Sequence, residues 1–485
     1  MLLKNVIEGL NILDIKGNEN IDITGIEYDS RNVTEDSLFV CIKGFKSDGH
    51  KYIETAMKKG AKAFLVEDDI DVDIDIDGCT FVKVEDTRAD MARISDNFYE
   101  HPSRKLGVIG VTGTNGKTSI TTFLEEILIR ANKKLGLIGT IKIFDGDKEI
   151  ISSRTTPESP DLQHYFDTML KNGCDHCAME VSSHSLALNR VLATEFELGI
   201  FTNLTPDHLD FHKDMDDYRE AKEKLFHMTT KANIINIDDE GGRKIYENIK
   251  GLKTPCYTYG VDNKADFMAR DIKSDAEGVS YRLVTPTFEE VIFVPVPGMF
   301  TVYNTLAVIA ACYELGIDKS VYKEGLRLTG GVSGRFETVP NDREMSVIVD
   351  YAHTPDALEN VLKTGREFVK GRLISVFGCG GDRDSEKRPL MGEIGQKYSD
   401  ICFITSDNPR TEEPNAIIAD ILGGVDVDKK NYHVVVDREE AIKEAIEMGE
   451  KGDVILIAGK GHEDYQVIGE TKHHFDDKEV ALRYM

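Results

Sequence analysis

A glycine-rich turn between a strand pattern and a helix pattern is the feature that most constrains the fold of this chain. The apolar run LGVIGV at 106–111 is typical of a buried strand, and the turn follows directly. From 118 to 132 apolar residues recur at helical spacing, which buries one face of a helix against a sheet. A strand, a glycine turn and a helix in this order indicate a P-loop nucleotide-binding domain.

The residue types in this turn suit phosphate and magnesium. Glycines let backbone N–H groups face phosphate oxygens, Lys117 suits the β and γ phosphates, and Thr118 supplies a hydroxyl for Mg²⁺. The strict GxxxxGK[ST] pattern fails at one position, because Val111 stands where its first Gly belongs. We expect ATP with Mg²⁺ as the ligand, bound by Thr112, Gly113, Thr114, Asn115, Gly116, Lys117 and Thr118.

The rest of the chain is expected to form two further α/β domains. A length of 485 residues suggests about three domains. Short strand and helix patterns alternate before a linker at 101–105, and again after the glycine-rich stretch TGGVSGRFE at 329–337. We therefore expect an α/β protein with domains at 1–103, 104–331 and 332–485. The central domain should be a doubly wound parallel sheet and the last one Rossmann-like.

Charge and hydropathy exclude several kinds of partner. With 59 Lys and Arg against 86 Asp and Glu, the net charge of −27 repels nucleic acid and anionic membranes. The longest apolar run, 306–313, is far shorter than the roughly 18 residues of a membrane span. The N-terminus carries no secretory pattern, and eight cysteines are too sparse for a disulfide framework. We expect a cytoplasmic, monomeric protein with small-molecule substrates.

Acidic and imidazole groups suggest where a metal binds. Glu180 and His208 follow strand patterns in the central domain, and ligands gather at the carboxyl edge of a parallel sheet. These two side chains are expected to complete a metal site near Lys117. The acidic stretch 69–77 matches only the opening of a calcium loop, because Val84 stands where the bidentate Glu belongs. A charged edge strand or loop is expected there.

Several motifs in order resemble those of the Mur ligase family, across essentially the whole chain. They are GVTGTNGKT, SRTTPES, MEVSSH, NLTPDHLDFH, YREAKEKLF, GRFE, DYAHTPD and GCGGDRD. The resemblance implies three domains that hold a UDP-sugar, ATP and an incoming amino acid, in that order.

The later motifs GGDRDSEKRPLM, SDNPRTEEP and AGKGHEDYQ resemble the members that add diaminopimelate during peptidoglycan biosynthesis. This implies an ATP-dependent ligase that joins meso-2,6-diaminopimelate to the D-Glu γ-carboxylate of UDP-N-acetylmuramoyl-L-alanyl-D-glutamate through an acyl phosphate. A lysine-adding sister ligase and a folylpolyglutamate synthetase-like ligase are the alternatives within ligase chemistry. A nucleotide-dependent switch without ligase chemistry is the alternative outside it.

The resemblance also implies roles for single residues. Lys222 is implied to be carbamylated, and its carbamate is a hard oxygen ligand for Mg²⁺ beside Thr118, Glu180 and His208. The implied catalytic residues are Lys117, Glu180, His208 and Lys222. Further ATP neighbours are Asn304, Arg335, Asp350 and His353. The muramoyl dipeptide is implied to contact Ser30, Thr155, Thr156, Ser182 and Arg190. The diaminopimelate pocket is implied to contain Arg383, Asp407, Asn408, Pro409, Arg410, Gly459 and Glu463.

Overall fold

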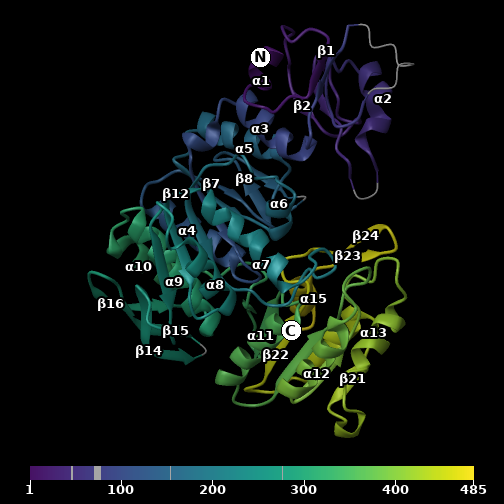
Figure 1. Ribbon diagram of the computed structural model, residues 1–485. Coiled ribbons are helices and arrows are strands. Elements are labelled where there is room, and N and C mark those ends of the chain that lie inside the picture. The colour runs from purple at the N-terminus through teal and green to yellow at the C-terminus, as the bar shows by residue number, and fades with distance from the viewer. Residues whose placement is uncertain (45–46, 70–77, 153, 276) are drawn as a thin grey trace.

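The computed structural model describes residues 1–44, 47–69, 78–152, 154–275 and 277–485. Three large sheets follow one another along the chain, and a two-stranded ribbon lies near the C-terminal sheet (Figure 1). We call the residues around these sheets the N-terminal, central and C-terminal units. Most of the acidic stretch 69–77 lies outside the described residues. No helix in the described part of the chain combines the length and apolarity that crossing a membrane requires.

The N-terminal unit is a five-stranded sheet in the order β1-β5-β4-β3-β2, with β1 antiparallel to its neighbour. Helix α3 begins after Asp86, whose carboxylate accepts hydrogen bonds from the N–H groups of Arg88 and Ala89. The expected linker at 101–105 contains one 3₁₀ turn, η2. The elements are α1 (Leu3–Val6), β1 (Asp14–Lys16), β2 (Ile26–Glu27), β3 (Leu38–Val40), η1 (Gly49–Tyr52), α2 (Ile53–Lys58), β4 (Ala63–Val66), β5 (Thr80–Lys83), α3 (Thr87–Phe98) and η2 (Pro102–Arg104).

The central unit is an eleven-stranded sheet in the order β16-β15-β14-β13-β12-β11-β6-β10-β7-β8-β9. Its strands are β6 (Gly107–Thr112), β7 (Leu135–Ile138), β8 (Lys142–Phe144), β9 (Glu149–Ile151), β10 (His176–Glu180), β11 (Phe196–Phe201), β12 (Thr229–Asn236), β13 (Cys256–Gly260), β14 (Phe267–Asp275), β15 (Gly278–Val284) and β16 (Glu289–Val294). The middle strands are parallel, as predicted. Antiparallel strands, which we did not predict, extend both ends.

Helices cover both faces of this sheet, which makes it doubly wound. Helices α4, α9 and α10 pack on one face, in a core that includes Ile120, Leu306 and Leu326. Helices α5 and α8 pack on the other, in a core that includes Phe166 and Ile245. The elements are α4 (Lys117–Arg130), α5 (Ser159–Lys171), α6 (Ser183–Ala187), α7 (Met215–Glu223), η3 (Lys224–His227), α8 (Glu240–Ile249), α9 (Met299–Glu314) and α10 (Lys319–Leu328).

The C-terminal unit is a six-stranded sheet in the order β17-β18-β22-β19-β20-β21, parallel except for β17. A fully buried ion pair of 2.7 Å joins Arg438 at the start of α14 to Asp477 of α15. The elements are β17 (Glu337–Val339), β18 (Ser346–Asp350), α11 (Pro355–Phe368), β19 (Leu373–Phe377), α12 (Lys387–Tyr398), β20 (Ile401–Ile404), α13 (Pro414–Leu422), η4 (Val427–Lys429), β21 (Tyr432–Val434), α14 (Arg438–Met448), β22 (Val454–Ala458), β23 (Tyr465–Ile468), β24 (Thr471–His474) and α15 (Asp477–Arg483).

Candidate functional site

The glycine turn joins the carboxyl end of β6 to the first residue of α4. Gly113 and Gly116 have φ angles of 146° and 90°, in the region that glycine adopts most readily. A Cβ atom at Gly116 would lie 2.5 Å from Oδ1 of Asn304 on α9. Glycine at 116 therefore allows the turn to approach Asn304, which brings this predicted ATP neighbour next to the loop.

Lys117 folds its side chain back over the loop that precedes it. Its Nζ donates hydrogen bonds to the carbonyl oxygens of Gly113, at 2.9 Å, and Thr114, at 2.8 Å. Burial lowers the pKa of Lys117, and the nearby Glu180 carboxylate opposes that shift. The ammonium thus lies at the N-terminus of α4, where backbone N–H groups and the helix dipole already favour an anion.

Thr118 contacts residues of both the central and the C-terminal units. Its hydroxyl donates to Oε1 of Glu180 at 3.1 Å, and Nη2 of Arg335 donates to the same hydroxyl at 3.2 Å. Thr140 fixes the Glu180 carboxylate, because its N–H and hydroxyl donate to the two carboxylate oxygens at 2.8 and 3.0 Å. A second link between the units joins Asn115 to Asp356 at 3.1 Å. The predicted Arg335 therefore reaches the P-loop.

Two other predicted ATP neighbours lie beyond Arg335, on the C-terminal sheet. The guanidinium of Arg335 lies 4.6 Å from the ring centre of Tyr351, and Nδ1 of His353 is 2.8 Å from the Tyr351 carbonyl oxygen. Asp350 ends β18 and accepts hydrogen bonds from the N–H groups of Phe336 and Ala352. Burial raises the pKa of Asp350 to about 6, against the lowering effect of Arg335.

Lys222 and His208 lie near enough to the loop for the Lys117 ammonium to act on both of them. The Lys222 side chain is buried in α7, and its Nζ lies 4.3 Å from the ring centre of Tyr218. Burial and the neighbouring Lys117 ammonium lower the pKa of Lys222 well below its usual value. Burial likewise lowers the pKa of His208 to about 4, although Asp207 opposes the shift. Both groups are thereby favoured in their neutral forms.

Thr118 and Glu180 provide oxygen atoms that suit magnesium, whereas an unmodified Lys222 does not. Hydroxyl and carboxylate oxygens are hard ligands, and Thr118 and Glu180 supply them within 3.1 Å of each other. A lysine ammonium has no lone pair for a metal. A neutral amine, however, is the form that reacts with CO₂, and the burial of Lys222 favours it. The residues present therefore fit a Mg²⁺ ion if Lys222 carries a carbamate.

A polar cluster lies at the N-terminus of α6. The Thr156 hydroxyl donates to the Glu180 carbonyl oxygen at 2.9 Å and accepts from the N–H of Ser182 at 3.1 Å. Arg190 donates to the Thr156 carbonyl oxygen at 3.1 Å. Thr155 shares a hydrogen bond of 3.0 Å with the Thr140 hydroxyl. The four central residues predicted to bind the muramoyl dipeptide, Thr155, Thr156, Ser182 and Arg190, are thus brought together.

Ser30 lies in the turn after β2, in the N-terminal unit. Polar contacts join this unit to the central one. The Tyr28 hydroxyl donates to Oδ2 of Asp161 on α5 at 2.6 Å, and Arg88 of α3 lies 3.5 Å from Glu158. Glu158 also pairs with Arg190 at 3.0 Å. Sequence reasoning missed Glu158, although it lies within the quoted motif SRTTPES.

The predicted diaminopimelate residues gather after the carboxyl ends of β20 and β22. Asn408 donates to Oε2 of Glu463 at 2.9 Å. Gly459 has a φ of 124°, and a Cβ atom there would lie 2.5 Å from Oδ2 of Asp407. Arg410 donates to the Gly381 carbonyl oxygen at 2.7 Å and has a positive φ of 53°. Pro409 is buried between Asn408 and Arg410.

Arg383 lies at the edge of that cluster, because a Cβ atom at Gly380 would lie 3.0 Å from Nη1 of Arg410 and 3.8 Å from Cγ of Arg383. It is exposed on the rim of a cleft of about 460 Å³ between the central and C-terminal units. The cleft is lined by Leu209, Asp210, Asp382, Arg383, Asp384, Ser385 and Glu386. Its central-unit wall directly follows His208 in the chain. The cleft therefore adjoins both the predicted metal ligand and the predicted amino-acid pocket.

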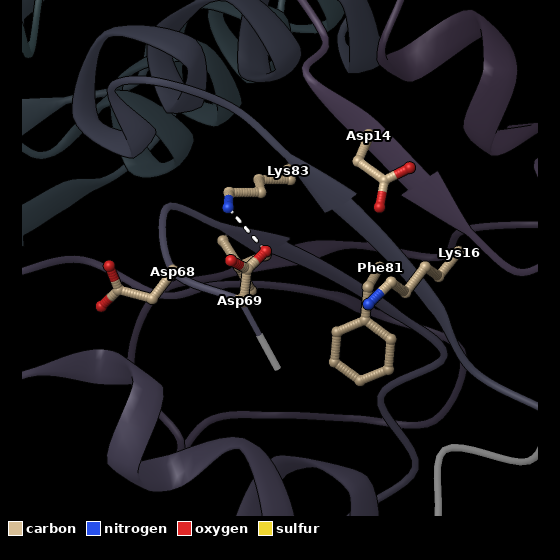
Figure 2. A pocket seen from close by; sticks show the side chains of 7 residues that line it. Asp14, Lys16, Asp68, Asp69, Phe81 and Lys83 are labelled. Carbon is tan, nitrogen blue, oxygen red and sulfur yellow. Dashed lines mark hydrogen bonds and ion pairs between the residues drawn. The ribbon is translucent and has the colours of Figure 1, made fainter. Parts of the chain in front are cut away.

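A depression in the N-terminal unit is a poor ligand site. Figure 2 shows its side chains, with Lys83 paired to Asp69 at 2.6 Å. Its cavity volume of about 10 Å³ leaves room for a water molecule at most. In the same unit, Asp48, His50 and Asp68 lie together, but Nδ1 of His50 pairs with Asp48 and Nε2 faces the Glu67 N–H. That histidine already has partners at both ring nitrogens.

Sequence reasoning also missed Lys460, whose ammonium is fully buried among the predicted diaminopimelate residues. A lysine next to two glycines in a loop pattern is usually solvated. The available signal was its place inside the quoted motif AGKGHEDYQ. Tyr218 was missed as well, because its contact with Lys222 depends on helical spacing within α7.

Comparisons with known proteins agree with this arrangement. The Mur ligase family catalytic domain matches residues 22–99, the Mur ligase middle domain matches 111–312, and the Mur ligase glutamate ligase domain matches 334–461. The UDP-N-acetylmuramoyl-L-alanyl-D-glutamate–2,6-diaminopimelate ligase of Clostridioides difficile (strain 630) is 74% identical over 99% of both chains. The ligase of the same name from Alkaliphilus metalliredigens is 50% identical over 99% of this chain and 97% of its own.

A solved structure extends the likeness to three dimensions. The structure of a UDP-N-acetylmuramoyl-L-alanyl-D-glutamate–2,6-diaminopimelate ligase superposes with a TM-score of 0.71 and 30% sequence identity. It covers 100% of this chain and 98% of its own. Three matched family domains, full-length relatives and a fold shared over the whole chain show that the chain belongs to the Mur ligase family.

Proposed function

We propose that this protein joins meso-2,6-diaminopimelate to the D-Glu γ-carboxylate of UDP-N-acetylmuramoyl-L-alanyl-D-glutamate, with ATP as the energy source. The observation that carries the proposal is a P-loop that contacts the C-terminal unit through Arg335, with one polar cluster at the N-terminus of α6 and a second after β20 and β22. The C. difficile relative, 74% identical over 99% of both chains, bears the name of this activity. The reaction belongs to peptidoglycan biosynthesis, and so to cell shape and division. We place it in the cytoplasm, where ATP and UDP-linked substrates are available.

The three units take different substrates in this proposal. Residues 1–103, with Ser30, hold the UDP-sugar, residues 104–331 bind ATP, and residues 332–485 bind the amino acid. We propose a monomer because the residues assigned to all three substrates lie in one chain, whose neighbouring units meet at Tyr28 with Asp161 and at Arg335 with Thr118. Sedimentation of the pure protein tests that oligomeric state.

The reaction needs activation of a carboxylate, because joining it directly to an amine is unfavourable in water. The γ-carboxylate oxygen attacks the γ-phosphorus of ATP, and the bond to the bridging oxygen breaks to release ADP. An amine of diaminopimelate then attacks the acyl phosphate carbonyl, inorganic phosphate leaves, and the amine gives up a proton to form the amide. Catalysis of this kind rests on positioning and charge neutralisation.

The residues divide this work between them. Lys117 at the helix N-terminus neutralises phosphate charge, and Arg335 adds a second cation beside Thr118. Thr156, Ser182 and Arg190 hold the dipeptide with its γ-carboxylate toward the loop. Glu463 and Arg410 hold the amino acid on the facing unit. The bridges between the units keep water from the acyl phosphate, which it would hydrolyse.

Thr118, Glu180, His208 and a carbamylated Lys222 are the residues that would hold magnesium. When bound, the ion supplies positive charge to the phosphate oxygens of ATP. The hydrogen bonds from Thr140 to both oxygens of Glu180 support this assignment, because they orient the carboxylate.

The decisive experiment measures ADP release with the muramoyl dipeptide and one amino acid at a time. We expect turnover with meso-diaminopimelate and little with L-lysine. A preference for L-lysine would favour the sister ligase, and use of a folate with glutamate would favour a folylpolyglutamate synthetase-like ligase. ADP release that needs neither dipeptide nor amino acid would overturn ligase chemistry altogether.

A further inference from the structure

Lys460 is a fully buried lysine in the C-terminal unit. It lies in the loop after β22, and its side chain is 0% exposed. Its Nζ donates to Oδ1 of Asn408 at 3.0 Å and to the Tyr465 carbonyl oxygen at 2.5 Å. A fully buried ammonium is unfavourable unless its charge and its donors are matched. Two carboxylates match the charge.

Those two carboxylates are Asp407 and Glu463. Oδ1 of Asp407 lies 3.8 Å from the Lys460 Nζ, and Oε2 of Glu463 lies 3.7 Å from it. Burial and the neighbouring Asp407 both raise the pKa of Glu463. Lys460 opposes that shift. Without its ammonium, Glu463 would hold a proton to a higher pH.

Lys460 also orients the amide between those acids. Oδ1 of Asn408 accepts from Lys460 and from the N–H of Val467, at 2.9 Å. The opposite end of the amide, Nδ2, must then face Glu463, where it donates at 2.9 Å. One cation thus fixes the direction of an amide that in turn holds the carboxylate.

We propose that Lys460 is a positioning residue for the amino-acid substrate: it keeps Asp407 and Glu463 available as a paired anionic site and orients Asn408 against Glu463. This inference rests on the proposed function and adds a residue to it. The part of the ligand that this site takes is the ammonium group of an amino acid, because two carboxylates beside one Lys460 ammonium leave a net negative charge that attracts a cation. Lys460 itself has no exposed surface and acts through its neighbours.

Several other charged or titratable groups face Glu463 and contribute to its titration. Arg438 lies on α14, Arg410 belongs to the loop after β20, and Tyr351 belongs to the loop after β18. Tyr465 lies on β23. Asp477 of α15 acts on Lys460 and pairs with Arg438. None of these is altered by a substitution at Lys460, so a change in the pH profile reports the loss of one ammonium.

The test uses Lys460→Met in the full-length enzyme, with Lys472→Met as the matched control. Lys472 lies over the Tyr465 ring, with its Nζ 3.9 Å from the ring centre, but it is exposed on β24. For Lys460→Met we expect the KM for diaminopimelate to rise at least about tenfold, while the KM for ATP changes little, and the control to resemble wild type. The rise should be larger at pH 6 than at pH 8, because Glu463 keeps its proton longer.

Two further measurements keep the inference open to refutation. If Lys460 acts through Glu463, the losses from Lys460→Met and Glu463→Gln should be less than additive in the double variant. Should Lys460→Met fail to fold, Lys460→Gln carries the same expectations. A diaminopimelate KM within about twofold of wild type at both pH values, or an equal rise in the KM for ATP, overturns the inference. A wild-type enzyme that does not use diaminopimelate overturns the proposed function instead.

Discussion

Arg410 should decide which amino acid the enzyme accepts, and Arg410→Ala tests this. meso-Diaminopimelate differs from lysine by one distal carboxylate, and a guanidinium can hold that group with two parallel hydrogen bonds. In the Arg410 side chain, Nη1 donates to the Gly381 carbonyl oxygen at 2.7 Å. The planar fork keeps further N–H donors for a ligand.

The size of the effect follows from those hydrogen bonds. Hydrogen bonds to a charged partner contribute roughly 1.5–3 kcal/mol, or about 10- to 150-fold in an equilibrium constant. Alanine keeps the Cβ atom, so the steric cost of the positive φ of 53° is the same in both proteins. We therefore expect kcat/KM for meso-diaminopimelate to fall about a hundredfold, with lysine use unchanged or higher.

The assay is ADP release at saturating ATP and muramoyl dipeptide, with each amino acid varied in turn. Arg410→Lys should lose an intermediate amount, because it keeps the charge without the fork. Arg483→Ala is the matched control, since Arg483 pairs with Glu439 on the surface of the same unit. The reasoning is wrong if Arg410→Ala leaves the ratio of the two kcat/KM values unchanged, or if wild type uses both amino acids equally well.

Three other predictions concern charge in and near the site. Lys117→Met should lower kcat for ADP release about a hundred- to thousandfold with an unchanged fold, because a preorganised phosphate contact is lost; near-normal kcat would remove Lys117 from the ATP site. Lys222→Ala should lower turnover, and added acetate should restore part of it. ¹³C NMR in labelled bicarbonate should detect a carbamate in the wild type and not in the variant. A fully active variant would remove Lys222 from the site. Burial and Asp161 raise the pKa of the half-buried Glu27 to about 7 from 4.5, so ionising it costs stability as pH rises through that window. Glu27→Gln should therefore raise the free energy of unfolding by about 1–2 kcal/mol at pH 8, after allowance for solvent screening, and should leave it unchanged at pH 4.5. Thermal unfolding measures both values, and an equal gain at the two pH values would contradict the pKa shift.

Local pattern was sufficient for the P-loop, because its residues are contiguous. A strand, glycines and Gly116-Lys117-Thr118 carry their chemistry in a stretch of a few residues. The parallel middle of the central sheet followed from the same pattern. The antiparallel strands β15 and β16 did not, since short alternating strands resemble many loops and edges. Their place depends on pairing with β14, which no local pattern specifies.

Contacts across long separations explain what sequence reasoning missed. Arg335 reaches Thr118 across 217 positions of the chain, so their meeting depends on how two sheets pack. Lys460 meets Asn408 across 52 positions. Its charge suggests a solvated side chain, and only the packing of two loops makes it buried. The resemblance to a family pointed to most of the candidate residues, but the pairing of Glu158 with Arg190 and the proposed role of Lys460 come from geometry.

The short ribbon of β23 and β24 is hydrogen-bonded to the main chain of Arg410. The Arg410 N–H donates to the Val467 carbonyl oxygen at 3.0 Å, and the Arg410 carbonyl accepts from the Gly469 N–H at 2.7 Å. These bonds involve backbone alone, so the side chain of Ile468, between Val467 and Gly469, does not take part in them. Ile468 is half exposed there. A cysteine introduced at 468 would therefore make an attachment point for a fluorescent dye, and the dye would report amino-acid binding from beside the pocket without occupying it.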